Sequence, residues 1–150
     1  MTKARPMIGA VRRVTAVAAV AVVALVSFGQ APASAGTQFA PDHFKVCLDK
    51  ACDAYVEGNI AWGQRTAYVS GEVVNPSDNG WIIAYFDAFA GPTKIDGTTR
   101  TRGEKGKRPI GFYIGKADLP GGIDRIRTQV CWDHEVELRK CGKQWNDIRD

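Results

Sequence analysis

Apolar and polar residues alternate along several short segments of the chain, most clearly in residues 123–132. There Val130 and Trp132 fall on one face of an extended segment, whereas two arginines, a glutamine and Cys131 fall on the other. A period of two with one apolar and one polar face is typical of a half-buried β-strand. Residues 81–90 differ because both of their faces are largely apolar, which predicts a central strand covered on both sides.

Similar segments rich in Val, Ile, Tyr, Phe, Trp and Thr recur along the chain, separated by Gly, Pro, Asn and Asp, and no stretch reads as a convincing amphipathic helix. The expected strands are residues 44–48, 55–62, 65–74, 81–90, 94–102, 110–114 and 123–132, with a weaker segment around Trp145. Many short strands punctuated by turn residues are typical of all-β sandwiches and barrels. We predict an all-β fold, a single small antiparallel β-sandwich of about 7–8 strands.

The start of the chain has the pattern of a secretory signal peptide. Basic residues precede an apolar run over residues 14–28, and the small residues Ala33 and Ala35 stand before an expected cleavage site after Ala35. The run is shorter than the roughly 20 residues that span a bilayer. We therefore predict a signal peptide over residues 1–35, a single domain over residues 36–150, and an extracellular product with no stable membrane insertion after cleavage.

The apparent basicity of the chain belongs to this signal. Four of the 20 Lys and Arg residues precede Gly36, so the remaining 16 balance the 16 Asp and Glu residues. A mature protein without excess positive charge lacks the long-range field that concentrates nucleic acid or anionic membrane, so nucleic acid is not an expected partner. A domain of this size buries roughly two-thirds of its unfolded surface and can fold alone.

The four cysteines occur in two similar segments, VCLDKAC and VCWDHEVELRKC. In an oxidising compartment an even number of cysteines favours two disulfides. Local pairing, Cys47 with Cys52 and Cys131 with Cys141, would close a short loop at the exit of each strand and stabilise the fold by roughly 2–3 kcal/mol per loop. We favour this pairing, although four cysteines allow three connectivities and the sequence does not exclude the two long-range ones.

The second cysteine segment also contains His134, and it must be considered as a metal site. Neither cysteine spacing matches the Cys-x2–4-Cys pattern of structural zinc sites, and HEVEL lacks the second histidine of a zinc-protease motif. We predict neither a metal nor another cofactor. The role of His134 stays open from the sequence.

No catalytic constellation stands out in the mature region. Ser70 and Ser77 lie outside a G-x-S-x-G context, and all four cysteines have expected partners. His43 lies near the mature N-terminus, and no two carboxylates are marked as a pair of the kind that glycosidases use. We therefore assign no catalytic residue and favour a non-enzymatic protein.

A binding role has better material. Exposed tryptophans on small β-scaffolds stack on sugars or anchor protein interfaces, and Trp62 and Trp145 are expected to be exposed because they lie near a turn and the terminus. A polar segment, GEKGKRP over residues 103–109, is predicted to be an exposed hairpin loop with a local positive patch. The basic residues of this region that could bind an anionic polymer are Arg100, Arg102, Lys105, Lys107 and Arg108, and the simpler interpretation is a solvated loop.

Several features taken together resemble the small secreted proteins of unknown function found in filamentous actinobacteria. These are the Ala/Val-rich signal, the early Cys-x4-Cys, the stretch GQRTAYVSGEV, and the late GGIDRIRTQVCWD followed by a final cysteine. The resemblance implies a disulfide-stapled β-sandwich without an assigned activity, and it carries over no catalytic residue.

Two hypotheses from different classes follow. The leading one is a secreted, non-enzymatic β-sandwich that binds an extracellular protein or a cell-wall glycan. The alternatives are a small extracellular hydrolase, and a secreted inhibitor or toxin that inserts a rigid exposed loop, such as residues 103–109, into its target. An aromatic-lined shallow face would favour binding, whereas a cleft where His134 or two carboxylates converge would favour catalysis.

Overall fold

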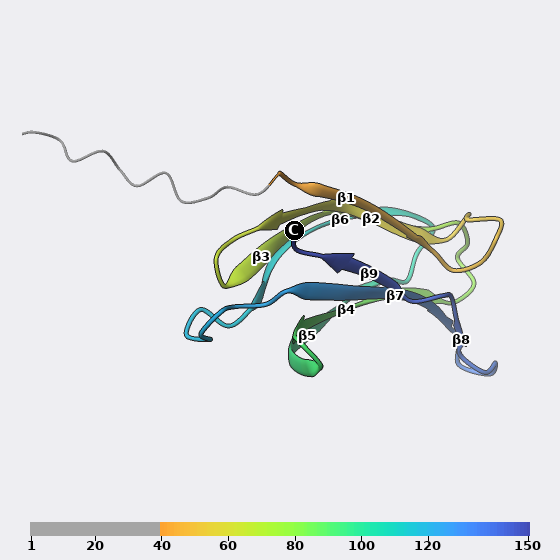
Figure 1. Cartoon of the computed structure of the whole chain (residues 1–150). Helices are drawn as coiled ribbons and strands as arrows, with labels where there is room; N and C mark the ends of the chain where they lie inside the picture. Colours follow the sequence, from red (N-terminus) through yellow and green to blue (C-terminus); the bar gives the residue numbers. More distant parts are fainter. Residues whose placement is uncertain (1–39) are drawn as a thin grey trace, which may run out of the picture. The chain divides into compact units, whose positions relative to one another are not determined.

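The computed structural model describes residues 40–150, which contain nine strands and no helix (Figure 1). The strands are β1 (Asp42–Cys47), β2 (Tyr55–Trp62), β3 (Thr66–Asn75), β4 (Trp81–Ala90), β5 (Thr93–Arg102), β6 (Gly106–Gly115), β7 (Arg125–Asp133), β8 (Lys140–Cys141) and β9 (Trp145–Ile148). Within these residues no helix has the length and hydropathy needed to cross a membrane. The expected signal peptide, residues 1–35, lies outside the described residues.

The strands form two antiparallel sheets. One has the order β1-β2-β3-β6, and the other has the order β5-β4-β7, with β8 and β9 each paired to β7 (Figure 1). The predicted all-β sandwich is confirmed. The strands exceed the expected number by one, because the two-residue strand β8 adds to the sheet beside β7, whereas β9 is the short segment expected around Trp145.

The core follows the alternation of the sequence. Phe86, at the middle of the apolar strand β4, contacts Phe44 of β1 edge-on at 6.2 Å between ring centroids and Phe112 of β6 at 5.0 Å. All three rings are buried, and burial of each contributes roughly 1.5–3 kcal/mol. On β7, Val130 is fully buried, and Trp132 is half-buried against the core, as its parity predicts.

Two glycines let β2 and β3 approach closely. Gly58 and Gly71 are opposite each other in the antiparallel register. A Cβ atom on Gly58 would collide with the carbonyl oxygen of Ser70, and one on Gly71 would collide with that of Glu57. Only glycine fits both positions, so this pair fixes the path of the two strands.

Trp62 is buried, and the prediction that it is exposed is wrong. Its side chain is 4% exposed because every second residue of β2 is buried, as Val56 and Ile60 are, and this alternation continues to the last residue of the strand. The indole N–H donates to the carboxylate of Asp42 at 2.6 Å. Trp145, by contrast, is 53% exposed, as predicted.

Both disulfides pair locally, Cys47 with Cys52 and Cys131 with Cys141, which confirms the favoured connectivity. Cys131 lies on the face of β7 away from the core, yet it is only 2% exposed. It is covered because β8 returns alongside β7 and places Cys141 directly opposite it.

Candidate functional site

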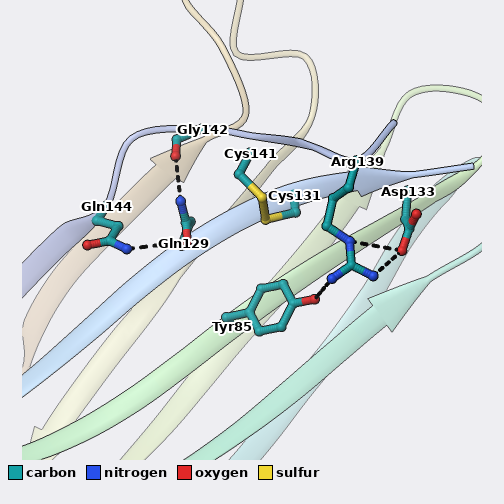
Figure 2. The surroundings of a disulfide bond; sticks show 8 residues. All are labelled: Tyr85, Gln129, Cys131, Asp133, Arg139, Cys141, Gly142 and Gln144. Atoms are coloured by element: carbon teal, nitrogen blue, oxygen red, sulfur yellow. Dashed lines mark hydrogen bonds and ion pairs between the residues drawn. A yellow bond between two sulfur atoms is a disulfide. The ribbon is translucent and has the colours of Figure 1, made fainter. Parts of the chain in front are cut away.

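The two disulfide-bonded segments, far apart in the sequence, lie against each other. Gly142, the residue after Cys141, packs so closely on the backbone of Cys47 and Leu48 that a Cβ atom at this position would collide with their carbonyl oxygens. The Gly142 N–H donates to the carbonyl of Val130 at 2.8 Å. Its carbonyl accepts from the Gln129 side chain at 2.9 Å (Figure 2). Gly142 is therefore the junction that joins the C-terminal segment to the end of β1.

A cleft of about 370 Å³ opens beside this junction. It is lined by Lys45, Val46, Cys47, Leu48, Asp49, Lys50, Lys143, Gln144 and Trp145. Apolar contributions come from Leu48, from the disulfide-bonded Cys47 and from the ring of Trp145, whereas lysines supply most of the charge. We call this feature the junction cleft.

Trp145 is held by its own strand. Its indole N–H donates to the Asp147 carboxylate two residues later, at 3.1 Å. This hydrogen bond satisfies the polar edge of the indole, while the side chain remains 53% exposed. The ring therefore offers apolar surface to a partner without leaving an unsatisfied donor.

The lysines of the cleft differ in whether they form ion pairs with acidic side chains. Lys45 pairs with Glu57 at 3.0 Å and lies 3.9 Å from the centroid of the Tyr55 ring. Among residues 40–150, neither Lys50 nor Lys143 has an acidic side chain within 4.0 Å. The junction cleft therefore combines apolar surface with two ammonium groups that no carboxylate of the described chain neutralises.

Asp49, the acidic residue of the cleft, accepts hydrogen bonds from the backbone of its own loop. One carboxylate oxygen of Asp49 accepts the N–H groups of Ala51 at 3.0 Å and Cys52 at 3.2 Å. Such side-chain-to-backbone bonds stabilise turns. Asp49 therefore shapes the loop that the Cys47–Cys52 disulfide closes.

A second polar cluster lies on the outer face of the β5-β4-β7 sheet. Asp87 forms ion pairs with Lys94 at 2.6 Å and Arg127 at 2.8 Å. Partial burial by itself would raise the pKa of Asp87, but the hydrogen bonds and charges of these two cations outweigh it and hold the pKa below its usual value. A carboxylate stabilised in this way is a poor general base, so we assign the cluster a structural role.

Arg139, just before β8, lines the same surface depression as this cluster, and Figure 2 shows its contacts. Its guanidinium donates to the Tyr85 hydroxyl at 3.1 Å and makes two hydrogen bonds to the carboxylate of Asp133. The charge of Asp133 and the Tyr85 contact raise the pKa of Arg139, which stays protonated at any physiological pH. These contacts anchor both ends of the segment between β7 and β8.

Within that segment the role of His134 becomes clear. Its ring stacks on Trp132 with 5.5 Å between centroids and 9° between planes, and Nδ1 accepts the N–H of Val136 at 3.4 Å. No group of three or more His, Cys, Asp or Glu side chains in the described part of the chain is arranged to hold a metal ion. His134 therefore acts as a support for the loop that follows it.

Two carboxylates, those of Asp147 and Asp42, influence each other, although the sequence marked no such pair. Asp147 is 9% exposed, and its Oδ2 atom is buried without a hydrogen-bond partner among residues 40–150. Burial raises the pKa of Asp147, and the charge of Asp42 raises it further, against the lowering effect of the Trp145 N–H. Buried carboxylates with a raised pKa are candidates for general acids. Neither carboxylate, however, lines the junction cleft.

The five basic residues predicted to form a positive patch differ in their contacts. Arg100 lies over the Phe112 ring at 4.1 Å, whereas Lys107 pairs with Glu72 of the neighbouring strand β3. The exposed loop is also shorter than expected, because β6 begins at Gly106 and the connection from β5 to β6 is only residues 103–105. Arg100 and Arg102 are half-buried, whereas Lys105, Lys107 and Arg108 are exposed, so only part of the set is the solvated loop of the simpler interpretation.

Arg102 and Arg108 are the two members of this set that come together. They line a shallow cleft with Trp81, which is 39% exposed. Arg102 donates to the Lys105 carbonyl at 3.0 Å and lies 3.7 Å from Glu104, and Arg108 donates to a backbone carbonyl of β5 at 2.6 Å. Each guanidinium group thus has a partner within the chain, unlike the lysines of the junction cleft, although Nε of Arg102 is buried without a hydrogen-bond partner among residues 40–150.

No protein-family model, curated protein or solved structure matches this chain. The site is therefore interpreted from its own geometry. Of the residues selected from the sequence, Trp145 lies in the junction cleft and Trp62 does not. Lys50 and Lys143 were missed, because a lysine in a turn carries no local signal of what it will face. The one available hint was the repeated Cys-x-Asp pattern of the two segments.

Proposed function

We propose that this chain is a secreted, non-enzymatic binding protein whose junction cleft recognises an acidic, apolar segment of an extracellular protein. The observation that carries the proposal is the pairing of an exposed Trp145 ring with two unneutralised ammonium groups, those of Lys50 and Lys143, in one cleft. Two disulfides support an extracellular location, because such bonds persist in oxidising compartments.

The chemistry of the cleft selects the ligand class. An apolar side chain can bury surface against Trp145 and Leu48, while neighbouring carboxylates satisfy the lysines. Extended segments that alternate glutamate with leucine or valine meet both requirements. A cell-wall glycan is the second candidate, because sugars stack on exposed indole rings. The predominance of apolar surface beside Trp145 favours the peptide.

The cleft offers little to a hydrolase. Asp49 is bonded to the backbone of its own turn, and Cys47 is in a disulfide. The lining holds no histidine, and neither Asp42 nor Asp147 reaches it. Binding is therefore the activity that this geometry supports best.

The test uses a fluorescein-labelled peptide of alternating glutamate and leucine, titrated with the secreted protein while anisotropy is recorded. We expect saturable binding that weakens with salt, and a loss of affinity of about tenfold for Lys143→Glu or Lys50→Glu. Lys116→Glu is the matched control, because this lysine is exposed and lies outside the cleft. A peptide with lysine in place of glutamate should not bind.

Two outcomes would contradict the proposal. Affinity that is unchanged by both cleft substitutions would show that the peptide binds elsewhere. The second outcome is that the protein does not bind the peptide but binds a soluble acidic cell-wall polysaccharide, and that Trp145→Ala abolishes this binding. Such a result would identify the glycan as the ligand.

A further inference from the structure

The loop between β7 and β8 displays apolar side chains to solvent. Val136 is 84% exposed and Leu138 is 90% exposed, the two highest values among the large hydrophobic residues of the described chain. They alternate with Glu135 and Glu137, which are also exposed. Glu137 pairs with Lys140 at the end of the same loop, 3.4 Å away, whereas Glu135 makes no ion pair among residues 40–150. Contiguous exposed apolar surface, unlike a single exposed side chain, is a feature of interaction sites.

This loop is rigidly supported at its base. The Cys131–Cys141 disulfide and the Asp133–Arg139 ion pair close it from both ends (Figure 2). Inside the loop, the His134 ring accepts the N–H of Val136 and stacks on the half-buried ring of Trp132. A loop that is held in shape before binding loses little conformational entropy when it docks.

The occupant that would cover the tip of this loop must offer apolar surface and positive charge. The two cations of the loop are already paired, Arg139 with Asp133 and Lys140 with Glu137. Glu135 beside the apolar residues would be repelled by anionic lipid, which argues against insertion into a membrane. The junction cleft has the required chemistry, with Trp145 and Leu48 as apolar contacts and Lys50 and Lys143 as cations. The chain therefore carries both a ligand of the proposed class and the site that fits it.

We propose that the stapled loop, residues 134–140, docks into the junction cleft of a second copy of this chain. The exposure of Val136 and Leu138 shows that the loop does not fill the cleft of its own chain. Loop and cleft flank the same residues, Cys141 and Gly142, so a two-fold arrangement lets each copy give its loop and receive the other's. This inference rests on the proposed peptide recognition by the cleft, and it makes self-association a competitor of any external ligand.

Sedimentation equilibrium of the secreted protein tests the inference directly. We expect the weight-average mass to rise from monomer to dimer with concentration. Leu138→Asp on the loop and Lys143→Glu in the cleft should each raise the dissociation constant by about tenfold or more. Leu138→Ser repeats the loop test without adding charge, and Lys116→Glu should leave association unchanged. Thermal unfolding of each variant checks that the fold is intact.

A charge exchange gives the sharpest outcome. Glu135→Lys with Glu137→Lys should weaken association, and mixing this variant with the Lys50→Glu, Lys143→Glu variant should restore a heterodimer. A wild-type protein that stays monomeric up to millimolar concentration would overturn the inference. So would a dimer that is insensitive to both the loop and the cleft substitutions. If the acidic peptide still binds a monomeric protein, self-association fails while the proposed function stands.

Discussion

Removal of the C-terminal disulfide gives a quantitative test of how the chain is stabilised. Cys131 and Cys141 are 10 residues apart, and Cys47 and Cys52 are 5 apart. Loop-closure entropy grows with the logarithm of this separation. Loss of the Cys131–Cys141 bond therefore costs about 2.7 kcal/mol, and loss of the Cys47–Cys52 bond costs about 2.1 kcal/mol. Cys131 is also buried, and its replacement by alanine leaves a small void that adds to the larger figure.

The assay is urea unfolding of the two double alanine variants, followed by tryptophan fluorescence and analysed by linear extrapolation. We expect both to unfold at lower urea than the wild type, with the Cys131→Ala, Cys141→Ala variant the less stable. Its melting temperature should fall by about 10 °C or more. The entropic reasoning is refuted if the Cys47→Ala, Cys52→Ala variant loses more stability, or if neither variant loses as much as about 1 kcal/mol.

Three further substitutions test single features of the fold. The pKa of Asp147 is raised, so the folded chain binds this proton more tightly than the unfolded chain, and stability falls as pH rises from the ordinary value of 3.8 through the raised one. Asp147→Asn should therefore raise the free energy of unfolding by about 1 kcal/mol at pH 7 and by less near pH 3. Thermal melts of the variant and the wild type at both pH values test this, and a variant that is no more stable than the wild type at pH 7 would contradict it. Gly58→Ala forces a collision with the Ser70 carbonyl and should cost about 3 kcal/mol or more in urea unfolding; a cost below about 1 kcal/mol would mean that β2 and β3 can separate freely. Trp62→Phe removes the donor to Asp42 and should cost about 1–3 kcal/mol, and a double-mutant cycle with Asp42→Ala that shows no coupling would assign the loss to packing instead.

Sequence periodicity determines most of the strands. The β7 alternation sets which face of that strand is buried, because a shift of one residue would turn the arginines into the core. The same rule, applied to its end, would have placed Trp62 correctly. Trp62 has the parity of Ile60, and the nearby turn misled the prediction because the strand continues fully to that turn.

The N-terminal half of β6 could not be recognised from its residues. Lys107, Arg108 and Pro109 are typical of a loop, yet they are acceptable in β6 because it pairs only with β3. An edge strand tolerates proline and outward-pointing charge. Sequence shows the composition of such a segment but not its place at the edge of a sheet.

The junction cleft was beyond prediction for a different reason. It depends on the contact of Gly142 with the end of β1, and nothing local to either segment requires that contact. Pairing of cysteines within each segment was predictable from spacing, whereas the meeting of the two segments follows from the order of strands in both sheets. Trp145 could be predicted to be exposed, but not to line the same cleft as Lys50.

The same contact sets an order of events during folding. The first strand, β1, touches β9, so residues 42–47 cannot reach their final packing until residues 142–148 have been synthesised. Each disulfide, in contrast, joins cysteines that emerge almost together and can close early. Covalent closure is therefore local, whereas the packing of β1 against β9 joins the two ends of the domain, and contacts of such large sequence separation form slowly.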